Sequence, residues 1–136
     1  MLESVRQAAV IPIYDGQIYL ISSRNKNRWI IPKGTIEYRH TAGETALREA
    51  WEEAGLTGSL IGEPLGSYVY QKEGKDHHVI VFVMEVHKIH EAYPESYLRK
   101  RICCNLLDAL ERLDDQRIKS WIETALSNRC LQGLSE

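Results

Sequence analysis

The chain has 136 residues, of which 43% are hydrophobic and 26% are charged, and its formal net charge at pH 7 is −2. This length suffices for one compact domain with a buried core and leaves no room for a second. A net charge near zero excludes a global field that would favour nucleic acid or an anionic membrane. We therefore expect a single domain over 1–136 that binds neither.

The first third of the chain has the pattern of short strands separated by turns. Val5–Tyr14 and Gln17–Ser23 are predicted strands, and Asp15-Gly16 between them is a strong hairpin signal. Trp29–Ile31 is a short predicted strand, followed by a turn at Pro32-Lys33-Gly34.

The next segment predicts a helix over residues 42–54. Thr41 and Glu44 have the spacing of a capping box, and Gly55 followed by Leu56 is a typical helix end. One face of this helix is apolar and should dock on a sheet, which would place Trp51 in the core. The residues of that face are Leu47, Ala50, Trp51 and Ala54.

The opposite face of this predicted helix is acidic. Glu49, Glu52 and Glu53 project within an arc of roughly 100° and should point outward. An isolated run of this kind is most often a solvated helix face. Here each like-charged pair would cost about 0.2 to 0.5 kcal/mol, a penalty that a hard divalent cation with oxygen ligands would reverse. Mg²⁺ is the natural candidate.

The remainder of the chain predicts further strands and two amphipathic helices, which would cover both faces of a sheet. A polar turn at residues 73–75 separates the first two strands, and the tail after Asn128 is expected to fray. The predicted strands are Ser59–Gln71, His77–His87 and Arg99–Cys104, and the predicted helices are Asp108–Leu113 and Ile118–Leu126.

The cysteines favour reduced thiols over a disulfide framework, because they are odd in number and form no CxxC pair. They are Cys103, Cys104 and Cys130. A zinc site that combines His87 and His90 with the adjacent cysteines is disfavoured, because neighbouring strand residues point to opposite faces.

The N-terminal twenty residues lack a basic region, a long apolar core and a small-residue cleavage site. The longest apolar run, Val79–Met84, is far shorter than the about 20 residues that cross a bilayer. We expect a cytoplasmic protein without a membrane partner.

The segment from Gly34 to Leu56 resembles the Nudix box, a glycine, five residues, a glutamate, seven residues and then R-E-x-x-E-E-x-G with an aliphatic residue. Glu37, often acidic in the family, also matches. The positions that fit the pattern are Gly34, Arg48, Glu49, Glu52, Glu53, Gly55 and Leu56.

One position departs from the box, because His40 stands where the family has its first glutamate. In the family that glutamate usually pairs with the arginine that corresponds to Arg48. Glu44 lies four residues before Arg48 on the same helix face, so we expect it to make this ion pair instead. His40 would then be dispensable.

The resemblance covers most of the chain and is nearest the branch that hydrolyses diphosphoinositol polyphosphates and diadenosine polyphosphates. Cys103 and Cys104 depart from it, since an aromatic pair usually follows the basic triplet there. The stretches that carry the resemblance outside the box are Ser22–Arg24, Arg28–Pro32, Gly66–Tyr68, Tyr93–Ser96 and Arg99–Arg101.

The resemblance implies the Nudix fold, an α/β/α sandwich with a mixed β-sheet. It also implies one or more Mg²⁺ ions, with Mn²⁺ as an alternative, held by Glu49, Glu52 and Glu53 with the Gly34 carbonyl as a further ligand. Glu53 or Glu49 would accept the proton of the attacking water, and Arg48 would orient the carboxylates. Glu91 and Glu95 are distal alternatives for the base.

The basic residues around the box suit a substrate with several phosphates, because cations and metal ligands together match a polyphosphate better than either alone. The candidate substrate-binding residues are Ser23, Arg24, Lys33, Arg99 and Arg101. The expected function is Mg²⁺-dependent hydrolysis of a phosphoanhydride in a nucleoside- or inositol-linked small-molecule polyphosphate, with diadenosine polyphosphates favoured. The alternative is a Nudix-fold module that binds such a ligand without cleaving it.

Overall fold

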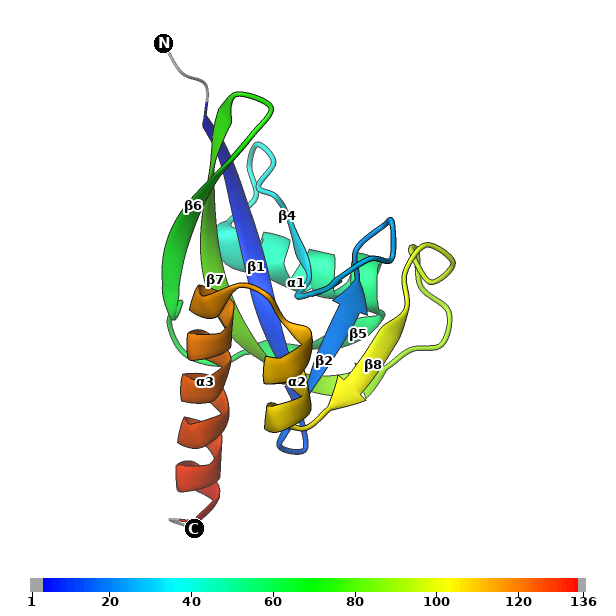
Figure 1. The fold of residues 1–136 in the computed structure, drawn as a ribbon, viewed down its shortest axis with the longest axis vertical. Helices are drawn as coiled ribbons and strands as arrows, with labels where there is room; N and C mark the ends of the chain where they lie inside the picture. The colour runs from blue at the N-terminus through cyan, green and yellow to red at the C-terminus, as the bar shows by residue number, and fades with distance from the viewer. Residues whose placement is uncertain (1–3, 135–136) are drawn as a thin grey trace.

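The computed structural model describes the backbone of residues 4–134 and the side chains of residues 4–127. Its described part is a mixed sheet of eight strands with helices on both faces (Figure 1). This confirms the predicted α/β/α sandwich. The elements in chain order are β1 Ser4–Tyr14, β2 Gln17–Ser22, β3 Trp29–Ile30, β4 Lys33–Thr35, α1 Ala42–Ala54, β5 Leu56–Leu60, β6 Gly66–Lys72, β7 Lys75–Ile89, β8 Arg101–Cys104, α2 Leu106–Arg112 and α3 Gln116–Leu134.

The centre of the sheet is the parallel pair of β1 and β7, and every other pairing is antiparallel. β7 is long enough to pair with β6 along its first half and with β5 along its second. β2 pairs with β1 only at the hairpin, so β4 pairs with the earlier part of β1 through Ala8–Gly34 and Ala9–Lys33. This split brings the start of the box segment onto the sheet.

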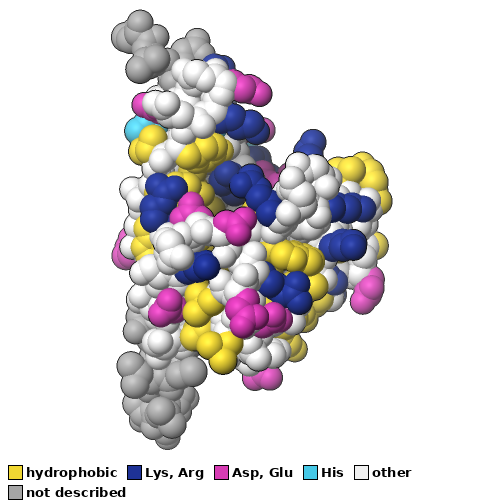
Figure 2. All heavy atoms as spheres, viewed as in Figure 1, with side chains coloured by type: hydrophobic (Ala, Val, Ile, Leu, Met, Phe, Trp, Pro, Cys, Tyr) yellow, Lys and Arg dark blue, Asp and Glu magenta, His cyan; other side chains and the backbone are white. Residues whose placement is uncertain are grey.

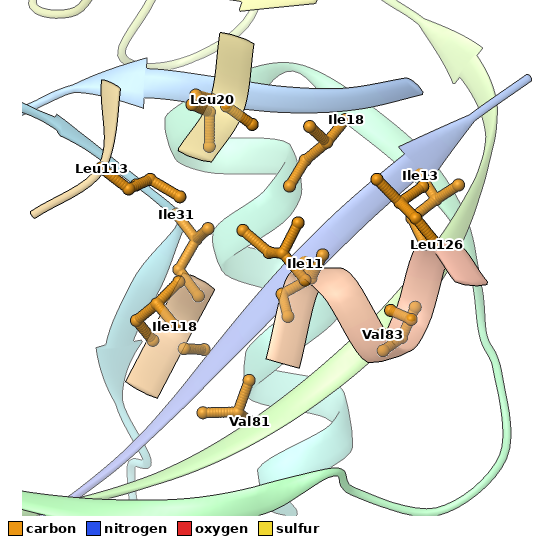
Figure 3. Close-up of a cluster of buried hydrophobic side chains, with 14 of the residues drawn as sticks. Ile11, Ile13, Ile18, Leu20, Ile31, Val81, Val83, Leu113, Ile118 and Leu126 are labelled. Atoms are coloured by element: carbon orange, nitrogen blue, oxygen red, sulfur yellow. The ribbon is translucent and has the colours of Figure 1, made fainter. Parts of the chain in front are cut away.

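Two apolar cores lie on opposite faces of the sheet because successive strand residues point to opposite sides. In β1, Ile11 and Ile13 point toward α2 and α3, whereas Val10 points toward α1. Figure 3 shows the first of these cores, in which Ile118 of α3 lies beside Ile31 and Leu126 of α3 lies beside Ile13. Each face of the sheet is therefore covered by its own apolar core.

Most predicted elements are present with bounds that shift by one to several residues, and two segments differ in kind. The strand predicted over Ser59–Gln71 is two strands, because Gly62 takes a positive φ of 62° between β5 and β6. Lys33–Thr35 is a strand, although the sequence predicted a turn there. The backbone of α3 continues to Leu134. The side chains after residue 127 lie outside the described residues, so the expectation of a frayed tail after Asn128 stays a prediction.

No described helix combines the length and the hydrophobicity that crossing a membrane requires.

Candidate functional site

Both ends of α1 form as predicted. Thr41 Oγ1 accepts from the Glu44 N–H at 3.0 Å, and the Glu44 carboxylate accepts from the Thr41 N–H at 3.0 Å, which completes the capping box. Gly55 ends the helix with φ 65°, and its N–H donates to the Trp51 carbonyl at 3.0 Å. These local bonds define where the helix that carries the acidic residues begins and ends.

The orientation of α1 differs from the prediction. The helix packs Ala46, Ala50 and Ala54 into the core, and this rotation buries Glu49 and Glu53, which are 9% and 7% exposed. The prediction that all three glutamates point outward is therefore wrong for these two. The prediction that Trp51 lies in the core is also wrong. Its ring is half-buried and contacts His90 edge-on, with 5.0 Å between centroids.

The Glu53 carboxylate has a hydrogen-bond donor on each oxygen. Oε1 accepts from the Lys33 N–H at 3.0 Å, and Oε2 accepts from Arg99 Nη2 at 3.0 Å. Burial raises the pKa of Glu53 to about 7, although the Lys33 N–H and the Arg99 charge act in the opposite direction. The side chain is thus held in one orientation while its charge is disfavoured.

The Glu49 carboxylate packs against the backbone of Gly34. A Cβ at position 34 would overlap the Glu49 side chain, so the glycine at the start of the box allows this close approach. Burial raises the pKa of Glu49 to about 7, and the negative charges of Glu53 and Glu52 raise it further. Two buried carboxylates with raised pKa values mark this end of α1 as a candidate functional site.

The segment between β7 and β8 adds Glu95 and Arg99 to the site. Arg99 is 9% exposed and donates from Nε to Glu95 Oε1 at 3.1 Å and from Nη1 to the Ser22 carbonyl at 3.1 Å. The charge of Glu95 contributes to the raised pKa of both Glu49 and Glu53. Of the two distal glutamates suggested by the sequence, Glu95 therefore lies beside the site, whereas Glu91 is exposed.

Arg99 and Arg101 are bonded to protein groups in this structure, and the expectation that they bind the substrate stays a prediction. Arg101 Nη1 donates to the Ala54 carbonyl at 2.7 Å and to the His90 carbonyl at 2.8 Å. Both guanidinium groups are therefore bonded to protein acceptors on or beside α1. The sequence could not reveal this, because each acceptor on α1 lies more than forty residues away in the chain.

The expected ion pair between Glu44 and Arg48 does not form, because Glu44 is engaged in the capping box. Arg48 Nη1 instead lies 3.0 Å from His40 Nδ1 and 3.7 Å from Glu37 Oε2. The prediction that Glu44 replaces the family's usual partner is wrong. His40, predicted to be dispensable, contacts Arg48 together with Glu37.

The remaining candidate substrate-binding residues, Ser23, Arg24 and Lys33, differ in exposure and contacts. Arg24 has a side chain that is 72% exposed, 3.9 Å from Glu95 Oε1. Ser23 is buried, and its Oγ donates to Asn25 Oδ1 at 2.7 Å. Lys33 reaches in two directions, since its N–H bonds Glu53 while its Nζ donates to the Tyr70 hydroxyl at 3.1 Å.

A pocket of about 370 Å³ adjoins the carboxylates through Lys33. It lies between β3, β4 and β6 and the turn that joins α2 to α3, and its lining combines aromatic rings with charged groups. Figure 2 shows this face of the molecule, on which Lys and Arg side chains are interleaved with acidic and apolar ones. The lining includes Arg28, Trp29, Lys33, Tyr68, Tyr70 and Arg117, together with Leu113 and Ile118.

The donor set suits a hard divalent cation. Glu49, Glu52 and Glu53 offer carboxylate oxygens, the ligands that Mg²⁺ prefers, and each Glu53 oxygen keeps a lone pair after its hydrogen bond. In the described part of the chain, however, no three Asp, Glu, His or Cys side chains already converge around one metal position. The residues thus fit a metal by chemistry and charge, and the predicted ligand set stays a prediction.

The described cysteines are both free thiols. Cys103 is exposed and Cys104 is buried, in agreement with the expectation that neighbouring residues of a strand point to opposite faces. Cys130 lies outside the residues whose side chains are described.

Comparison with known proteins gives consistent matches. The chain is 34% identical over 119 residues to Nudix hydrolase 21, chloroplastic, of Arabidopsis thaliana, covering 84% of this chain and 59% of that protein. It is 37% identical over 101 residues to diphosphoinositol polyphosphate phosphohydrolase 3-beta of Bos taurus, covering 73% and 60%. The chain thus spans less than two thirds of the length of these relatives.

The fold resembles that of an Ap4A hydrolase from C. elegans, with a TM-score of 0.72, 21% identity and coverage of 93% of this chain and 98% of that one. A Nudix-family hydrolase from Clostridium perfringens gives a TM-score of 0.75 at 18% identity, with coverage of 93% and 98%. The NUDIX domain model matches residues 4–123. With the box residues of α1 in place, this match shows that the chain belongs to the NUDIX domain family.

Proposed function

We propose that this protein is a divalent-metal-dependent hydrolase that cleaves a phosphoanhydride bond in a nucleoside-linked polyphosphate, with diadenosine polyphosphates as the favoured substrates. The observation that carries the proposal is the pair of buried carboxylates, Glu49 and Glu53, next to a pocket lined by rings and cations. Burying two like charges is costly unless they are neutralised, so their retention here needs a functional reason.

Glu49, Glu52 and Glu53 would hold the metal, which neutralises phosphate oxygens and lowers the pKa of a bound water when present. Among the described residues, Glu49 accepts no hydrogen bond, whereas both oxygens of Glu53 do. We therefore assign Glu49 to accept the proton of the attacking water. Glu53, whose carboxylate is held in one orientation by its two donors, would act as a metal ligand only. The Lys33 side chain lines the pocket beside Tyr70, while its backbone N–H bonds Glu53, and its ammonium group would hold phosphate oxygens.

The pocket supports a nucleoside over an inositol as the group attached to the phosphates. Trp29, Tyr68 and Tyr70 line the pocket with aromatic rings against which a planar base can pack, whereas an inositol has no planar ring. The Tyr70 ring itself stacks on His77, with 4.7 Å between centroids. Arg117 lies 4.5 Å from the Tyr68 ring centroid and adds a cation beside it. Lys33 would direct the polyphosphate from this pocket toward Glu49 and Glu53.

The test is a product-release assay on diadenosine tetraphosphate, a diphosphoinositol polyphosphate, a nucleoside triphosphate and ADP-ribose, each with Mg²⁺ and with EDTA. Diadenosine tetraphosphate should give the highest kcat/KM, EDTA should abolish turnover, and Glu49→Gln should lower kcat at least about 10²-fold. Glu63→Gln, at an exposed position outside the site, is the matched control.

A preference for the inositol compound would overturn the substrate proposal and leave the hydrolase. Tight binding of these compounds without turnover of any would favour the binding module.

A further inference from the structure

The segment that joins β7 to β8 is fastened to the C-terminal half of α1. The His90 N–H donates to the Gly55 carbonyl at 2.8 Å, and the Glu95 N–H donates to the Glu52 carbonyl at 2.9 Å. In Figure 1 this segment lies beside the end of α1. The helix that carries the box carboxylates therefore has a second, distant part of the chain attached along its last turn.

Arg99 makes the side-chain connection. Each of its three guanidinium nitrogens donates to a protein acceptor: Nη2 to Glu53, Nε to Glu95 and Nη1 to the Ser22 carbonyl. These contacts join α1, the β7–β8 segment and the end of β2 at one buried cation. The planar guanidinium fixes the relative directions of the three acceptors, which a flexible ammonium group could not do.

Arg101 makes the backbone connection. It donates to the carbonyl of Ala54, the last residue of α1, where helix carbonyls lack an intrahelical partner and a cation is favoured. The ring of Tyr93 lies 5.0 Å from its guanidinium carbon, and Gly55 leaves the space that both side chains occupy. Loss of Arg101 would free the helix end immediately after Glu52 and Glu53.

We propose that Arg99 and Arg101 are positioning residues that set the direction of the α1 carboxylates for metal binding, and that neither binds the substrate. This deepens the proposed function and rests on it. Arg99 acts through the side chain of Glu53, and Arg101 acts through the last carbonyl of the helix. Hydrogen bonds that orient a metal ligand in this way typically change metal affinity 10- to 100-fold when removed.

The chain contains its own control for charge. Lys100 lies between the two arginines and is exposed, and its backbone N–H, which a substitution retains, donates to Ser22 Oγ. A change of Lys100 removes the same positive charge from the same segment without touching α1. A substrate-binding role for this basic triplet would therefore extend to Lys100, whereas a positioning role would not.

The experiment measures Mn²⁺ binding without substrate, by electron paramagnetic resonance of the free ion, together with thermal stability, kcat and KM. Arg99→Gln should weaken Mn²⁺ binding about 10- to 100-fold and lower kcat, with KM for the polyphosphate within twofold of wild type. Arg99→Lys should restore part of the affinity, because it keeps the charge between Glu53 and Glu95. Lys100→Gln should match wild type in Mn²⁺ affinity.

Arg101→Gln should weaken Mn²⁺ binding less than Arg99→Gln and lower the melting temperature, while Arg101→Lys recovers part of both. If Arg99→Gln does not fold, Arg99→Lys carries the test, with a several-fold weaker Mn²⁺ affinity expected. Normal Mn²⁺ affinity with a raised KM in the Arg99 variants would overturn the proposal.

Metal binding and hydrolysis are read separately, so the two proposals can fail independently. A wild-type protein that binds Mn²⁺ in an Arg99-dependent way but hydrolyses none of the tested compounds would overturn the hydrolase and leave the positioning role. A protein that binds no Mn²⁺ would overturn both.

Discussion

The carboxyl groups of Glu49 and Glu53 are buried, because α1 packs its alanines into the core and turns these two side chains toward the sheet. Burial disfavours their charged form. Their pKa values, raised to about 7, mean that the folded protein holds its protons more tightly than the unfolded chain does. For an acid with a raised pKa, stability is highest below the unfolded pKa and falls as the pH rises through the folded one. The carboxylates thus cost stability at neutral pH in the metal-free protein.

The first prediction at the residue scale is that Glu49→Gln stabilises the metal-free protein at pH 8. The pKa of Glu49 rises from 4.5 to about 7, so the penalty should develop between these pH values. The variant should exceed wild type by about 2 to 3 kcal/mol in free energy of unfolding at pH 8 and by much less at pH 4.5. Urea denaturation in EDTA at both pH values measures this.

The exposed Glu63→Gln substitution is the control and should leave the unfolding free energy unchanged at both pH values. An equal effect of Glu49→Gln at the two pH values would show that its carboxylate is not destabilised by burial.

At the scale of elements, α1 is defined by its ends. The capping box supplies two hydrogen bonds at the N-terminus, and Gly55 in the left-handed region supplies the turn at the C-terminus. The same glycine also makes room for Tyr93 and Arg101. Position 55 must therefore adopt a positive φ and must also lack a Cβ that would overlap its neighbours.

The second prediction separates these two requirements with a pair of glycine substitutions. Gly55 and Gly62 have nearly the same φ, 65° and 62°, but a Cβ at Gly62 would meet nothing within 4 Å, whereas one at Gly55 would overlap Tyr93 and Arg101. Gly62→Ala should lower the free energy of unfolding by about 1 kcal/mol, the cost of the backbone conformation. Gly55→Ala should cost at least about 2 kcal/mol, because packing must also change.

Urea denaturation of both variants measures the difference. Equal losses of unfolding free energy would mean that Tyr93 and Arg101 move away from Gly55 without cost. That result would also argue against a fixed position for Arg101 at the end of α1.

At the scale of the whole molecule, the sheet separates the layer of α2 and α3 from the layer of α1, which carries Glu49 and Glu53. α2 and α3 cover one face with side chains such as Ile118 and Ile122, and α1 covers the other (Figure 1). The pocket lies on the α2–α3 side, where Leu113 and Ile118 line it, and Lys33 connects it to Glu53 through its backbone N–H. Global stability and metal binding should therefore depend on different faces.

The third prediction tests this separation with Ile122→Ala. Ile122 of α3 is fully buried against the sheet, so its truncation should cost about 2 to 5 kcal/mol in free energy of unfolding. The increase in melting temperature on adding Mg²⁺ should remain close to that of wild type, because α1 lies across the sheet. Thermal unfolding with and without Mg²⁺ measures both effects, and loss of the Mg²⁺ response would show that the two layers are coupled.

Local signals in the sequence determined much of this structure. The bounds of α1, its capping box and the left-handed Gly55 were predicted correctly, because each depends on bonds between residues at most four or five positions apart. The hairpin at Asp15-Gly16 follows from the same kind of local preference. The spacing of the box residues, which identifies the family, is likewise a property of the sequence alone.

Only the tertiary structure decided which way the glutamates of α1 point and which residues hold them. The burial of Glu49 and Glu53 follows from how the helix rotates against the sheet, and amphipathic spacing defines that rotation only to within about one residue's turn. The contacts of Arg99 and Arg101 with α1 involve acceptors more than forty residues away, brought alongside by the pairing of β8 with β2. Basic residues near a phosphate-binding motif suggest substrate contacts, but whether a guanidinium faces a ligand or a buried carboxylate depends on the partners that the fold supplies.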